Sequence, residues 1–114
     1  MKNVLIFVFG ICLSVGVSAG YDVVGYITSV HLKDGVLNFA LSNRSADTYC
    51  KVGWAGLSFY VPKEHESYPY YYGLIVAANT HKQKVRLANI SVFDGTAACD
   101  ITKTGYGIIV YTKE

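Results

Sequence analysis

The sequence predicts a small, mainly β domain with one α-helix, in which three strands precede the helix and two follow it. Two early segments alternate apolar and other residues with the period of two that is typical of strands. A later segment instead spaces its apolar residues three and four apart, as a helix does. Two Asp-Gly pairs, Asp34-Gly35 and Asp94-Gly95, mark turns between these segments.

The first two strands are expected to form a hairpin. Residues 24–31 alternate and are rich in β-branched and aromatic side chains, which favour strands. Asp34-Gly35 supplies the positive φ angles of a tight turn. Leu37, Phe39 and Leu41 then follow at period two.

The third strand is expected in residues 49–61, after a polar loop over residues 42–48. It carries Cys50 and the single tryptophan, Trp54. The alternation slips between Trp54 and residue 57, next to Gly53, which indicates a bulge or bend.

The helix is expected in residues 69–80. Pro69 suits the first helical turn, where its missing N–H costs nothing. One helical face is formed by Tyr71, Leu74, Ile75 and Ala78. Gly73 weakens this prediction by about 1 kcal/mol relative to alanine.

The last two strands are expected in residues 84–92 and 99–111, separated by Asp94-Gly95. The complete order along the chain, β-β-β-α-β-β, is that of an OB-like five-stranded barrel in which the helix closes one end. In such a barrel the third and fifth strands can be neighbours, so Cys50 and Cys99 would tie them together.

Residues 1–19 have the three parts of a cleaved signal peptide. Lys2 gives a positive start, an apolar stretch follows, and Val17-Ser18-Ala19 places small residues before a cleavage site. The alternative is an uncleaved anchor, although the apolar stretch is short for a membrane span. We expect export to the periplasm or the medium, and a single domain over residues 20–114.

Two cysteines remain after cleavage, because Cys12 leaves with the signal peptide. An even pair in an oxidising compartment predicts a Cys50–Cys99 disulfide, which in the chain-entropy model stabilises the fold by about 4 kcal/mol. A redox pair or a metal site is the alternative. The spacing is far from the Cys-x-x-Cys of redox proteins, and few other ligands lie nearby.

Charge and motifs exclude several functions. The net charge of +2 gives no basic footprint for nucleic acid, and no second apolar stretch indicates membrane insertion. We expect the charged loop at residues 63–66 to be exposed to solvent and not to bind a metal ion. We also expect no cofactor. Catalytic signatures such as Gly-x-Ser-x-Gly and His-Glu-x-x-His do not occur, so we expect no enzyme.

The candidate binding residues are aromatic. Tyr68, Tyr70, Tyr71 and Tyr72 surround Pro69, and consecutive helical residues cannot all face one core. We therefore expect Tyr70 or Tyr72 to be exposed and able to stack on a ligand, while the alternative is that the tyrosines cover the barrel mouth. Trp54 either packs on the disulfide or forms a ligand platform.

The chain resembles two groups of exported bacterial proteins. The first comprises small disulfide-bonded periplasmic or secreted proteins without an assigned activity. The motifs that carry this likeness are Val24-Gly25-Tyr26-Ile27, Cys50, Leu74-Ile75-Val76-Ala77-Ala78, Lys84-Val85-Arg86 and Cys99. More distantly, its length and element order resemble the OB-fold B subunits of pentameric toxins, which bind glycans as rings.

The sequence thus favours a non-catalytic binding module for a glycan, a peptide or a component of the cell envelope. The alternative is a structural or ring-forming assembly subunit, as the toxin resemblance implies. A small secreted enzyme is the third hypothesis.

Overall fold

The computed structural model describes residues 20–112, except for the side chain of Trp54. The predicted signal peptide, residues 1–19, lies outside the described residues. The strands are β1 (Val23–Lys33), β2 (Val36–Leu41), β3 (Phe59–Val61), β4 (Lys84–Leu87), β5 (Cys99–Asp100) and β6 (Ile108–Val110). The helices are α2 (Tyr68–Thr80) and four short 3-10 turns, η1 (Ser45–Thr48), η2 (Trp54–Gly56), η3 (Ile90–Val92) and η4 (Ile101–Lys103).

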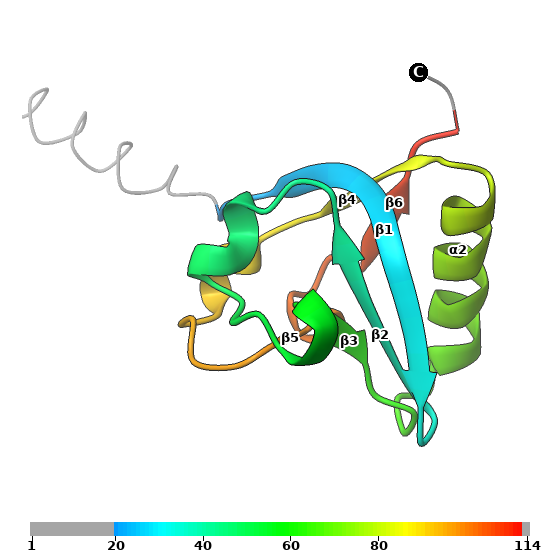
Figure 1. The fold of residues 1–114 in the computed structure, drawn as a ribbon, viewed down its shortest axis with the longest axis horizontal. Coiled ribbons are helices and arrows are strands. Elements are labelled where there is room, and N and C mark those ends of the chain that lie inside the picture. Colours follow the sequence, from blue (N-terminus) through cyan, green and yellow to red (C-terminus); the bar gives the residue numbers. More distant parts are fainter. Residues whose placement is uncertain (1–19, 113–114) are drawn as a thin grey trace, which may run out of the picture.

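The strands form one curled sheet in the order β5-β3-β2-β1-β4-β6. All neighbours are antiparallel except β3 and β5, which are parallel. In Figure 1 the long β1 strand curves across the sheet, α2 lies on one side, and η1 and η3 lie on the opposite side. The prediction of a mainly β fold with one helix is confirmed, and the sheet is a half-barrel.

The predicted count of five strands is wrong, because the last predicted strand is broken. Residues 99–111 form β5 and β6, which lie at opposite edges of the sheet. Between them the Asp100 carboxylate accepts a hydrogen bond from the Thr102 amide at 2.9 Å and so begins η4. Gly105 and Gly107 then adopt φ angles of 87° and 67°. This left-handed backbone cannot continue a strand, so the two halves of the segment separate.

The third and fourth predicted strands are shorter than expected for the same reason. Ala55 and Gly56 have φ angles of 59° and 80°, so only residues 59–61 of the predicted strand 49–61 pair in the sheet. Asn89 has a φ of 60°, and β4 ends before it. The expected hairpin is confirmed, with Asp34 and Gly35 at φ angles of 53° and 83° between paired residues 33 and 36.

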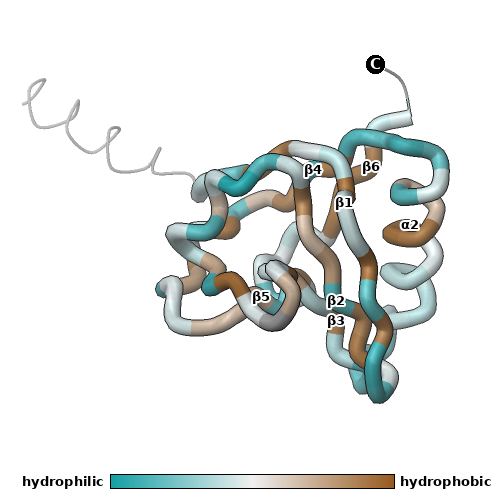
Figure 2. The backbone as a smooth tube through the Cα atoms, in the orientation of Figure 1, coloured by the Kyte–Doolittle hydropathy of each residue, from teal (hydrophilic) through white to brown (hydrophobic). Residues whose placement is uncertain are grey.

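The core lies inside the curl of the sheet and is closed on one side by α2. Its largest fully buried side chains include Phe39, Leu37 and Ile75. The predicted helical face is only partly correct, because Leu74 is 45% exposed while Ile75 and Ala78 are buried. Figure 2 shows hydrophobic residues in the middle of α2 and hydrophilic ones at the β1–β2 turn.

The predicted Cys50–Cys99 disulfide is present, and both cysteines are fully buried in the core. Cys50 follows η1 rather than lying in a strand, whereas Cys99 begins β5. The disulfide therefore joins a loop, not the third strand, to the edge of the sheet.

The start of β1 is anchored by a polar cluster. The Asp22 carboxylate accepts hydrogen bonds from the Asn89 amide at 2.9 Å and from Arg86 Nε at 2.9 Å. The Asn89 amide first, and then the Arg86 guanidinium, lower the pKa of Asp22 below its usual value. Asp22 therefore stabilises the fold in its charged form.

Candidate functional site

A cavity of about 700 Å³ lies between the β1–β2 hairpin and two loops. Its lining residues are His31, Lys33, Asn38, Gly53, Leu57 and Ala98. Ligand sites of this size generally combine an apolar lining with a few polar groups that orient the ligand. Here Leu57 and Ala98 supply apolar surface, and the hairpin supplies the polar groups.

The hairpin wall is fixed by strand pairing. His31 of β1 lies directly opposite Asn38 of β2. Leu37 and Phe39 flank Asn38 and are both fully buried. Because side chains alternate across a sheet, Asn38 points to the face away from the core. The imidazole of His31 and the amide of Asn38 are therefore neighbours on the cavity side of the sheet.

The wall contains one cationic side chain, which is ion-paired. Lys33, two residues after His31 and on the same face of the strand, forms an exposed ion pair with Asp34 at 3.3 Å. Among the described lining residues none carries a carboxylate. The wall thus offers an amide, an imidazole and an ammonium group, which can together bind carbonyl, hydroxyl or anionic groups.

The facing wall is the loop of residues 51–57. The Gly53 amide donates to the Leu57 carbonyl, and the Gly56 amide donates to the Gly53 carbonyl, both at 3.1 Å. These two bonds close the loop tightly. Ala55 at its tip adopts the left-handed conformation that is unfavourable for residues other than glycine.

The beginning of this loop is attached to the neighbouring wall residue, Ala98. Cys50 precedes the loop, and its disulfide partner Cys99 directly follows Ala98. The Lys51 amide also donates to the Ala97 carbonyl at 2.9 Å. The two loop walls of the cavity are therefore joined by one covalent bond and one backbone hydrogen bond.

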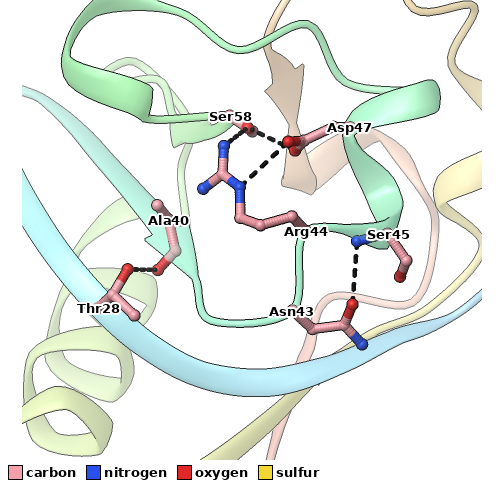
Figure 3. Close-up of polar contacts among 7 residues, drawn as sticks. All are labelled: Thr28, Ala40, Asn43, Arg44, Ser45, Asp47 and Ser58. Carbon is pink, nitrogen blue, oxygen red and sulfur yellow. Dashed lines mark hydrogen bonds and ion pairs between the residues drawn. The ribbon is translucent and has the colours of Figure 1, made fainter.

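The end of the loop is attached through Ser58, which is fully buried and polar. The Ser58 hydroxyl donates to Asp47 Oδ1 at 3.2 Å and accepts from Arg44 Nη2 at 3.3 Å. Arg44 Nε in turn donates to Asp47 Oδ2 at 3.1 Å. Figure 3 shows these three side chains converging.

The predicted tyrosine site lies on α2. Tyr70 is 76% exposed and Tyr72 is 37% exposed, so the surface contains the free rings that the sequence predicted. Tyr68 packs against the core, and its ring lies 6.0 Å from that of Tyr72. Burial first, and then the Asp100 carboxylate, raise the pKa of Tyr71, which is half-buried.

The structure does not bring the two sets of predicted residues together. Trp54 belongs to the loop that carries Gly53 and Leu57 of the cavity, although its side chain lies outside the described residues. In Figure 1, α2 and η2 lie on different sides of the β1–β2 hairpin. The tyrosines and the cavity are therefore separate surfaces.

Sequence reasoning missed the polar wall of the cavity. His31 lies near the end of the predicted first strand and belongs to no motif in the sequence. The turn at Asp34-Gly35 could have identified the pair, since a two-residue turn sets residue 33 opposite residue 36 and so His31 opposite Asn38. The facing loop is indicated in the sequence only by the slip in alternation next to Gly53.

Residues 20–112 contain no group of three or more His, Cys, Asp or Glu side chains arranged to hold a metal ion. Within the same range, no helix has the length and apolar character needed to cross a membrane. Comparisons of the chain with protein-family models, curated proteins and solved structures found no match.

Proposed function

We propose that this protein is a small exported, non-catalytic binding module whose ligand occupies the cavity between the β1–β2 hairpin and residues 51–57. The observation that carries the proposal is the cavity itself, about 700 Å³ in volume with one apolar and one polar wall. Both its size and its mixed lining are those of sites for small ligands or chain ends. The buried disulfide supports export, because disulfides persist in oxidising compartments.

The chemistry of the walls favours a ligand that combines polar and apolar parts. Asn38 and His31 can hydrogen-bond to hydroxyl or carbonyl groups, and the Lys33 ammonium can donate to the same groups. Leu57 and Ala98 would cover an apolar face. The end of a glycan, a peptide segment or a component of the cell envelope has this character.

A ring-forming assembly subunit is the second candidate, and the ends of the sheet favour it. In the described residues, β6 pairs only with β4, so its other edge is open to another strand. Ile109 on β6 is also 42% exposed. Exposed strand edges are the places where chains pair with one another. Light scattering distinguishes a monomer from a stable ring.

Binding is tested by screening the purified oxidised protein on a glycan array and in pull-downs from cell-envelope extracts. The variant Ala98→Phe would fill the cavity and should weaken binding at least tenfold. The matched variant Tyr70→Ala changes the other surface and should leave binding unchanged.

Three results would count against the cavity. Binding that survives Ala98→Phe but is lost in Tyr70→Ala would assign the ligand to α2 instead. Unchanged binding in both variants would exclude both surfaces. Retention of no glycan and no envelope component would contradict the binding function itself.

A further inference from the structure

We propose that Arg44, Asp47 and Ser58 are positioning residues that hold the loop of residues 51–57 in the conformation that forms the cavity wall. The inference rests on the proposed function for its biological meaning. Its physical content, the control of one loop by three side chains, is independent of the ligand.

The position of Ser58 gives it this control. Ser58 directly follows Leu57, which lines the cavity. The side chain of Ser58 is fully buried. Its hydroxyl makes one hydrogen bond to Asp47 and receives one from Arg44. A buried hydroxyl is costly to leave unpaired, so these bonds define where the loop ends.

The loop needs such support because its own contacts are few. Two backbone hydrogen bonds close it, from the Gly53 and Gly56 amides. At its tip Ala55 has a φ of 59°, a conformation that an alanine keeps only when its surroundings impose it. The disulfide fixes the beginning of the loop at Cys50. The cluster at Ser58 fixes the other end, together with the bond from the Cys99 amide to the Ser58 carbonyl at 2.8 Å.

The hydrogen bonds of the cluster join side chains only, and none of them belongs to the strand ladder. Arg44 and Asp47 are partly exposed, with side chains 41% and 33% accessible, whereas Ser58 is fully buried next to Phe59 of the core. Loss of these hydrogen bonds should therefore loosen the loop without unfolding the sheet. The disulfide differs, because both of its cysteines belong to the core.

Amide hydrogen exchange, followed by NMR on the purified oxidised protein, tests the inference. In Ser58→Ala the Gly53 and Gly56 amides should exchange about 2- to 10-fold faster, as expected for the loss of one or two hydrogen bonds. Amides of the β1–β2 ladder should be unchanged. Emission from Trp54, the single tryptophan, provides an independent reporter in the same loop.

Thr28→Ala is the matched control. It removes a hydroxyl that donates to the Ala40 carbonyl at 3.4 Å, a bond of the hairpin that Figure 3 also shows. It should leave the exchange of the loop amides unchanged. Asp47→Asn keeps an oxygen that can accept from Ser58, so it should restore much of the protection that Asp47→Ala loses.

Unchanged exchange of the loop amides in Ser58→Ala would overturn the inference. An equal rise across the loop and the sheet would also overturn it, because the role would then be structural. If Ser58→Ala does not fold, the same exchange measurement on Arg44→Gln tests the inference. This variant removes the guanidinium that bonds to Ser58, and Arg44 is partly exposed. A wild-type protein that binds nothing would reject the proposed function, while the exchange results would still stand.

Discussion

Replacing both disulfide cysteines with alanine, Cys50→Ala with Cys99→Ala, should lower the free energy of unfolding by about 4 kcal/mol. The two residues are 49 positions apart, and the chain-entropy cost of closing a loop of this length gives that magnitude. Alanine is preferred to serine because both sulfurs are fully buried, and two hydroxyls there would be left without partners.

Urea denaturation of the oxidised protein and of the double variant, followed by circular dichroism, measures the change. The variant should unfold at a lower urea concentration and with a steeper slope, because its unfolded chain is less compact. Small domains have total stabilities of about 5–15 kcal/mol, so a folded but weakened variant is expected. A loss below about 1 kcal/mol would refute the view that the disulfide stabilises this fold.

Three further predictions each test a single feature of the structure. Tyr71→Ala should cost about 2 kcal/mol because its ring is half-buried, whereas Tyr70→Ala should stay within about 0.5 kcal/mol; equal losses in urea denaturation would contradict the observed burial. Ala55→Gly should stabilise the protein by about 0.5 kcal/mol, since glycine relieves the left-handed strain but is more flexible when unfolded; a clear loss in the same assay would argue against that strain. The lowered pKa of Asp22 predicts that its stabilising effect is complete above its unfolded-state pKa and is lost as the pH falls through the folded-state value. Asp22→Asn should therefore flatten the acid limb of the stability–pH curve, and an unchanged limb would contradict this role.

The order of the first three strands and the helix could be predicted because local patterns determined it. Asp34-Gly35 set the hairpin, and the spacing of Tyr71, Ile75 and Ala78 set the helix within one residue of its observed start. The disulfide followed from the number of cysteines that remain after the predicted signal peptide. Each of these features depends on a short stretch of chain or on covalent chemistry.

The lengths of the strands and the position of the cavity could not be predicted in this way. The third strand is short because Ala55 adopts a left-handed conformation, which an alanine does not signal in a sequence. Leu74 is exposed because α2 presents Ile75 and Ala78 to the core. Tertiary packing determines which helical face is buried. The cavity forms where Gly53, Leu57 and Ala98 meet the hairpin, from three distant parts of the chain.

The most direct test of the binding proposal is an NMR titration of the isotopically labelled, oxidised protein with whichever glycan or envelope component the screens retain. We predict that the largest shift changes fall on the amides of His31, Asn38, Gly53, Leu57 and Ala98, which line the cavity. Shift changes that cluster instead at Tyr70 and Tyr72 on α2, or along β6, would contradict the assignment of the ligand to this cavity.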